Sequence, residues 1–123
     1  MYEIEIYADK DGKEPVTEYL LELLMRNDKN SRIKARKIQE YINFLSKCGT
    51  FIGEPVVKHI DGDIWELRPA KDRVLFVVMK KGKFLLLHAF TKKTSKTPEK
   101  EIERARAEYK DYLERGLDRD DDQ

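Results

Sequence analysis

The residues best suited to chemistry in this sequence are basic and gather in one stretch of the chain. Residues 68 to 96 hold nine Lys or Arg and one acid, Asp72, a local excess of +8, although the net charge of the whole chain is only +1. Such segregation favours a polyanionic ligand or an acidic protein partner. The alternative is a solvated face whose lysines only maintain solubility. Because guanidinium groups bind phosphate bidentately and ammonium groups bind it as point charges, phosphate is a natural ligand.

Most of this charge falls where predicted strands begin or end. The basic residues at these positions are Arg68 after one strand, Arg73 at the start of the next, and Lys92, Lys93 and Lys96 after the last. We expect them to converge on one concave edge of a sheet. Contacts of this kind suit the phosphates of RNA, which they would position without reading the bases.

Cleavage of RNA by its own 2′-hydroxyl needs a proton acceptor, stabilisation of the charge on phosphorus, and a proton for the leaving 5′-oxygen. Arg73 is the first candidate for charge stabilisation. His88 has an ordinary pKa near neutrality and is a candidate acid or base, but a histidine in an apolar run is also commonly a hydrogen-bonded core residue. Glu66 is a candidate general base, or an ion-pair partner that orients the arginines.

The sequence lacks the motifs of several common kinds of catalytic and metal-binding site. There is no glycine-rich phosphate loop, paired-carboxylate motif, CxxC or HExxH, and the single cysteine, Cys48, forms neither an internal disulfide nor a metal cluster. We therefore expect no metal and no cofactor. The acidic residues near the N-terminus exclude a signal peptide, and no apolar run approaches the ~20 residues of a membrane span. We expect a soluble cytoplasmic protein.

The elements that must position these residues follow from periodicity. Residues 2–6 alternate apolar and acidic side chains, as in a half-buried strand. Pro15 opens an amphipathic helix with apolar residues three and four apart. Asp28 or Asn30 caps a second helix that Gly49 ends. The outer face of this second helix is expected to carry four basic residues, Arg32, Lys34, Arg36 and Lys37.

From residue 55 the period becomes that of a sheet. An Asp-Gly pair at residues 61–62 predicts a hairpin, and the near-continuous apolar runs at residues 73–79 and 84–90 predict central strands covered on both faces. Thr97 is expected to cap a last helix that runs to Gly116. The order of elements predicts an α+β domain over residues 1–116, with an antiparallel sheet and the helices packed against one face, followed by an acidic, frayed tail at residues 117–123.

An ordered set of segments carries a family resemblance. These segments are residues 13–20, 64–68, 73–78, 86–98 and 101–105. Over residues 1–116 the chain resembles HigB-type toxins of the RelE/ParE superfamily, in the phage-derived branch. The resemblance implies a metal-independent mRNA endonuclease that acts on the translating ribosome and is neutralised by a helix-turn-helix antitoxin of HigA type. It also implies that operator DNA is contacted only through the antitoxin.

The resemblance extends to individual positions of the basic window. Arg73 matches the arginine that enters the central strand in RelE-like toxins, and Lys93 matches the basic residue after the last strand, so the resemblance implies that both are catalytic. Lys92 and Arg68 match neighbouring basic positions, so we expect Arg68, Lys92 and Lys96 to bind RNA. Two departures stand out: the lysine pair of RelE-like members is here Ile64 and Glu66, and no tyrosine follows the last strand. These departures imply either a different set of acid and base groups, for which His88, Glu66 and Lys96 are the candidates, or little acid-base catalysis by the protein.

Two other functions remain open. The first is a ParE-like inhibitor of DNA gyrase with the same fold and no cleavage chemistry, and the second is a nontoxic phage module that binds nucleic acid. Where the antitoxin docks is also open. It could block the basic edge or bind the face carrying Arg32, Lys34, Arg36 and Lys37, and in either case it should be rich in acids.

Overall fold

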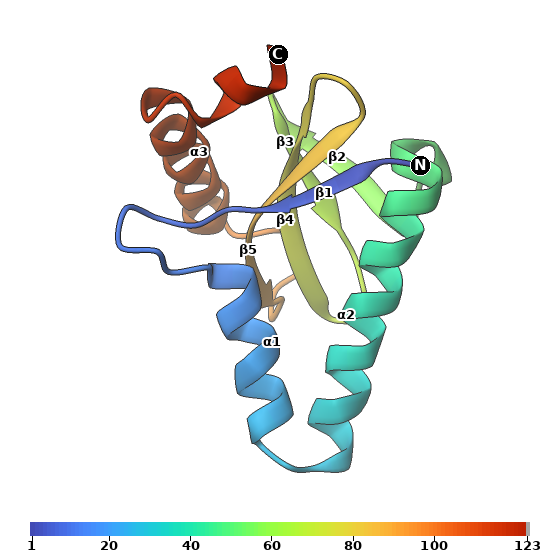
Figure 1. Ribbon diagram of the computed structural model, residues 1–123. Helices are drawn as coiled ribbons and strands as arrows, with labels where there is room; N and C mark the ends of the chain where they lie inside the picture. Colours follow the sequence, from blue (N-terminus) through green and yellow to red (C-terminus); the bar gives the residue numbers. More distant parts are fainter. Residues whose placement is uncertain (123) are drawn as a thin grey trace.

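The protein is built on a five-stranded mixed sheet with helices on both faces (Figure 1). The computed structural model describes the backbone of residues 1–122 and the side chains of residues 1–119, so Gln123, the last residue of the expected tail, lies outside the described residues. In chain order the elements are β1 (Glu3–Ile6), α1 (Pro15–Met25), α2 (Lys29–Cys48), the 3-10 helix η1 (Gly49–Ile52), β2 (Val57–Asp61), β3 (Ile64–Leu67), β4 (Asp72–Met79), β5 (Lys83–Thr91), α3 (Glu99–Glu114) and the 3-10 helix η2 (Leu117–Asp122).

Helix α1 begins where the sequence predicts, and helix α2 both begins and ends at predicted residues. Pro15 is the first residue of α1. Asp28, rather than Asn30, caps α2, because its carboxylate accepts a hydrogen bond of 2.8 Å from the backbone N–H of Ser31. Gly49 ends α2 with a φ of 63°, and a Cβ at this position would lie 2.7 Å from Cε2 of Tyr2. Glycine is therefore required by both the backbone and the neighbouring ring.

The strands lie in the order β1-β5-β4-β3-β2. Strands β2 to β5 form the predicted antiparallel meander, whereas β1 pairs in parallel with β5 through Glu3–Lys83 to Ile6–Leu86. The α+β class is confirmed, and the sheet is mixed rather than wholly antiparallel. The alternation of residues 2–6 indicated a strand but carried no information on its partner or direction.

Both faces of the sheet are covered, as the apolar runs of β4 and β5 predict. Helices α1 and α2 cover one face, with Val16, Leu23 and Ile38 packed on side chains such as Phe76. Helix α3 covers the other face through Ala105 and Tyr112. The expectation that all helices lie on one face was wrong, since the second apolar face of β4 and β5 also requires a cover.

A β-bulge in β5 changes which side chains face α3. Leu75 pairs with His88 but Phe76 pairs with Leu86, so Leu87 is an extra residue in the ladder. Residues before the bulge keep the parity of the sequence pattern, and residues after it are shifted by one. Simple alternation would place His88 on the same side of the sheet as Leu86. Because of the bulge, His88 lies instead on the side that α3 covers.

The C-terminal segment of the chain is partly helical. The segment predicted as an acidic tail contains η2, and the boundary at residue 116 stays a prediction. None of the helices in the described part of the chain is both long and apolar enough to cross a membrane.

Candidate nucleic-acid interface

Two adjoining hollows lie at the edge of the sheet where β3 and β5 end and β4 begins. The first has a volume of about 630 Å³ and is lined by Ala70, Lys71, Arg73, Thr91, Lys92, Lys93, Thr94 and Ser95. The second has a volume of about 280 Å³ and is lined by Lys58, His59, Ile60, Glu66, Arg68, Lys92, Ser95, Lys96, Thr97 and Ile102. Because Lys92 and Ser95 line both, the hollows form one continuous basic depression.

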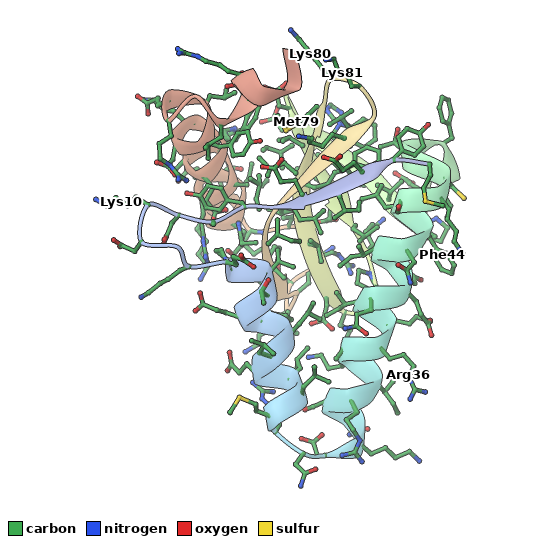
Figure 2. All side chains as sticks on the ribbon, viewed as in Figure 1. Lys10, Arg36, Phe44, Met79, Lys80 and Lys81 are labelled. Atoms are coloured by element: carbon green, nitrogen blue, oxygen red, sulfur yellow. The ribbon has the colours of Figure 1, made fainter. Side chains whose placement is uncertain are left out.

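The structure therefore brings the predicted basic residues together. Arg73, Lys92 and Lys93 line the first hollow, and Arg68, Lys92 and Lys96 line the second. The lysines of the β4–β5 turn, labelled Lys80 and Lys81 in Figure 2, lie at the other end of the sheet. The roles of these residues in catalysis and RNA binding stay predictions, but their convergence gives one cationic site, as a phosphate ligand requires.

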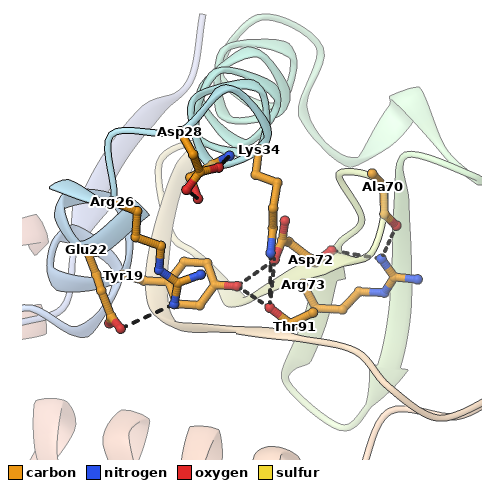
Figure 3. Close-up of polar contacts among 10 residues, drawn as sticks. Tyr19, Glu22, Arg26, Asp28, Lys34, Ala70, Asp72, Arg73 and Thr91 are labelled. Carbon is orange, nitrogen blue, oxygen red and sulfur yellow. Dashed lines mark hydrogen bonds and ion pairs between the residues drawn. The ribbon is translucent and has the colours of Figure 1, made fainter. Parts of the chain in front are cut away.

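Arg73 is fixed by the loop that precedes its strand (Figure 3). Its Nη1 donates hydrogen bonds of 2.8 Å to the carbonyl oxygens of Ala70 and Asp72. Burial lowers the pKa of the Arg73 guanidinium from its ordinary value, and Glu66 opposes this effect. The group stays charged, because an arginine pKa lies far above neutrality. Among the described residues Nη2 of Arg73 has no hydrogen-bond partner, so it is available to a ligand in the hollow.

Glu66 is the counter-ion of both arginines. It is 1% exposed, and its Oε1 lies 3.4 Å from Nε of Arg68 and 3.5 Å from Nε of Arg73. Neither Nε–H makes a hydrogen bond within the described residues, so these contacts are ion pairs without directional bonding. The hydroxyl of Thr97 donates to the other carboxylate oxygen. The geometry supports the interpretation of Glu66 as the partner that orients the arginines.

A second buried network supports Arg73 from the helix side (Figure 3). The Tyr19 hydroxyl donates a 2.5 Å hydrogen bond to Oδ1 of Asp72, and Thr91 donates to the same oxygen at 3.1 Å. Burial, and next the hydrogen bond to Asp72, raise the pKa of Tyr19 to about 12. Asp72 is also 3.4 Å from Nζ of Lys34. These contacts hold the start of β4 against α1 and α2.

Lys34 therefore does not lie on the outer face of α2, contrary to the expectation. Its neighbours Ser31, Ala35 and Ile38 are buried, which places Lys34 on the inward side of the helix. Arg32, Arg36 and Lys37 are exposed, and Figure 2 shows Arg36 directed away from the sheet. Lys34 was misplaced because a long amphipathic side chain can reach a buried carboxylate from the border of an apolar stripe.

His88 is not part of either hollow. The side chain is fully buried, with Nδ1 2.6 Å from Oε1 of Glu108 and Nε2 3.2 Å from Oε1 of Glu101. Both carboxylates belong to α3, so His88 ties this helix to β5. This matches the alternative interpretation of a hydrogen-bonded core histidine rather than an acid or base at the site.

The basic surroundings of the depression affect the pKa of Lys92. Burial lowers the pKa of the Lys92 ammonium, and the positive charges of Arg73, Arg68 and Lys58 lower it further against the opposing effect of Glu66. Cations at this density raise the local concentration of anions. Burial and neighbouring cations thus both favour loss of the proton from Lys92.

Three residues of the depression were not singled out from the sequence. Lys71 was counted in the basic window but not assigned, and Thr97 was interpreted as a helix cap, whereas the N-cap of α3 is Pro98 and Thr97 bonds to Glu66. Lys58 lies directly opposite Glu66 across the β2–β3 hairpin. The hairpin pattern alone would not have revealed this pairing. A two-residue turn at Asp61-Gly62 would set Lys58 opposite Trp65, whereas Asp61 itself pairs with Ile64 and the register shifts between His59 and Asp61.

The fold and the site together define a class of protein. A five-stranded sheet with three helices in an α+β arrangement is compatible with the RelE-like toxin fold. The family model of phage-derived Gp49-like proteins (DUF891) matches residues 22–110, and the chain belongs to this family. The family is part of the RelE/HigB-like toxins in general and is associated with toxins of toxin-antitoxin pairs. A search of curated proteins finds no match.

Proposed function

We propose that this protein is the toxin of a type II toxin-antitoxin pair, of HigB type, and that it cleaves mRNA on the translating ribosome. The observation that carries the proposal is the first hollow, where Arg73, Lys92 and Lys93 converge together with Lys71. No carboxylate is found among the described residues that line it. A site of this kind attracts the RNA backbone and can stabilise additional negative charge on phosphorus.

The reaction we propose is attack by the RNA on itself. The 2′-oxygen forms a bond to the adjacent phosphorus as the bond from phosphorus to the 5′-oxygen breaks, which leaves a 2′,3′-cyclic phosphate and a 5′-hydroxyl. Nη2 of Arg73 and the ammonium of Lys93 would stabilise the charge that accumulates on the non-bridging oxygens. No metal ion and no cofactor are needed for these steps.

Lys92 is our candidate for the proton donor. In the proposed step its ammonium gives a proton to the leaving 5′-oxygen, and the proton of the attacking hydroxyl passes to water. A lowered pKa makes an ammonium a better acid, and burial with Arg73 beside it lowers the pKa of Lys92. Glu66 and His88 are buried and occupied by other residues, so we assign them to positioning the arginines and α3.

The partner in this proposal is a HigA-type antitoxin. The exposed face of α2 that carries Arg32, Arg36 and Lys37 would bind an acidic surface of that antitoxin. Lys34 is left out because Asp72 already neutralises it. Operator DNA would be contacted through the antitoxin.

The test is induction of the wild type, of Arg73→Ala and of the control Lys80→Ala, followed by mapping of transcript 5′ ends. We expect the wild type and Lys80→Ala to arrest growth and produce new 5′ ends within coding regions. The Arg73→Ala variant loses one charge-stabilising group, so it should cleave mRNA about 10²- to 10³-fold more slowly than the wild type. Equal arrest and equal cleavage by Arg73→Ala would remove Arg73 from the mechanism.

One observation favours a second candidate function. The first hollow has neither histidine nor carboxylate among its described lining residues, which suits a ParE-like inhibitor of DNA gyrase that performs no cleavage. Such an inhibitor would induce a DNA-damage response while mRNA stays intact. The proposed nuclease would stop translation first, so the order of these two responses after brief induction separates the candidates.

A further inference from the structure

The second hollow is a site distinct from the one assigned to the scissile phosphate. It is smaller, about 280 Å³ against about 630 Å³, and opens beside the N-terminal end of α3. Its basic residues are Lys58, Arg68, Lys92 and Lys96. The hollow is continuous with the first through Lys92 and Ser95, so a ligand can occupy both at once.

Strand pairing explains why Lys58 reaches this place. Lys58 on β2 lies directly opposite Glu66 on β3, and side chains of directly paired residues share one face of a sheet. The backbone around them is fixed, since the N–H of Arg68 donates a 2.9 Å hydrogen bond to the carbonyl of Val56. Lys58 is thus presented by a strand rather than by a loose loop.

The charge of Lys58 is not neutralised by Glu66, the residue directly opposite it in the strand pair. Glu66 already forms ion pairs with Arg68 and Arg73 and accepts a hydrogen bond from Thr97. Among the side chains that the structure describes, Lys58 makes no ion pair. Lys58 and Lys92 both line the second hollow, so the two ammonium groups face the same space.

We propose that the second hollow binds the phosphate next to the scissile one in the same single RNA strand, and that Lys58 is the residue that sets this subsite apart. The inference rests on the proposed function for its ligand class. Two adjoining cationic hollows that share Lys92 offer separate places to two phosphates of one strand. The subsite contacts the backbone and is therefore independent of base sequence. Its effect is to fix the register of the strand over the first hollow.

The test measures binding of fluorescent 2′-O-methyl RNA, which lacks the attacking hydroxyl and cannot be cleaved, at several KCl concentrations. The variants are Lys58→Gln, the charge-preserving Lys58→Arg, and Lys47→Gln, an exposed lysine of α2 outside both hollows. We expect Lys58→Gln to weaken binding about three- to tenfold and to reduce the slope of log affinity against log salt by about 0.7, the value for one phosphate contact on a single strand. Lys58→Arg and Lys47→Gln should resemble the wild type.

Length dependence gives a second measurement. A trinucleotide with two phosphates should bind the wild type more tightly than a dinucleotide with one, and Lys58→Gln should lose most of this difference. Equal affinities and salt slopes for Lys58→Gln and Lys47→Gln would overturn the subsite, as would a wild type that binds both lengths equally. If Arg73 is needed for mRNA cleavage while Lys58 affects neither binding nor the cut positions, the subsite fails and the proposed function stands. If the wild type cuts no mRNA, the proposed function fails, and the salt slopes still decide whether Lys58 contacts RNA.

Discussion

Glu66 provides the most direct test of how the basic depression is held together. Its carboxylate is 1% exposed and lies within 3.5 Å of two guanidinium groups, while Thr97 donates to its other oxygen. Glu66→Ala would leave two cations without their shared counter-ion and Thr97 without its acceptor. Glu66→Gln keeps the shape and an acceptor for Thr97 but removes the charge, so the pair of variants separates packing from electrostatics.

The size of the effect follows from burial. Removing one partner of a buried ion pair costs about 3–5 kcal/mol. The side chain of Arg68 is 23% exposed and water can partly solvate it, whereas that of Arg73 is only 9% exposed. We therefore expect Glu66→Ala to lower the free energy of unfolding by about 3 kcal/mol, near the lower end of this range. For a chain of this length that corresponds to a fall in Tm of about 12 °C.

Thermal and urea unfolding followed by circular dichroism would measure both variants. Glu103→Ala, on the exposed side of α3, is the matched control and should change stability by less than about 0.5 kcal/mol. A double-mutant cycle of Glu66→Gln with Arg68→Gln should give a coupling energy of about 1 kcal/mol or more. The reasoning is refuted if Glu66→Ala is as stable as Glu103→Ala, or if the two changes in the cycle are additive.

Two further predictions concern titrating groups. If the Lys92 ammonium is the proton donor, kcat/KM should fall as pH rises through its lowered pKa, and Lys92→Arg, whose guanidinium stays protonated, should move this fall to higher pH. An unchanged pH profile in Lys92→Arg would contradict the assignment. The pKa of Tyr19 is raised from 10.0 to about 12, so its stabilising effect is complete below pH 10 and is lost as pH rises toward 12. Tyr19→Phe should cost about 1.5–3 kcal/mol at neutral pH and should flatten the loss of stability above pH 10 in urea titrations.

Local patterns were sufficient to place most elements. The cap at Asp28 and the stop at Gly49 each depend on a few neighbouring residues, and the structure has them at the expected positions. The hairpin between β2 and β3 is also present, but its turn falls at residues 62–63, one residue later than the Asp-Gly pair, with a register shift between His59 and Asp61. The parallel pairing of β1 and the place of α3 depend on tertiary contacts that periodicity does not encode. The α+β class was therefore predictable, while the mixed sheet and the cover on its second face were not.

For the site, the order of the strands along the chain predicted which residues lie close together. The directions of individual side chains were harder to predict. Arg68, Arg73 and Lys92 converge because consecutive antiparallel strands alternate direction, and this follows from the meander. The direction of His88 did not follow, because the bulge at Leu87 shifts the alternation by one residue. Lys34 also could not be placed, since its partner Asp72 lies 38 positions away in the chain.

The parallel pairing of β1 with β5 sets the order in which the molecule can be completed. Glu3 finds its partner Lys83 eighty positions later, so a nascent chain holds its first strand without a neighbour until almost all of the protein has been synthesised. Lys92, Lys93 and Lys96 follow that partner strand. A chain interrupted before β5 therefore lacks both the finished sheet and the lysines that follow it.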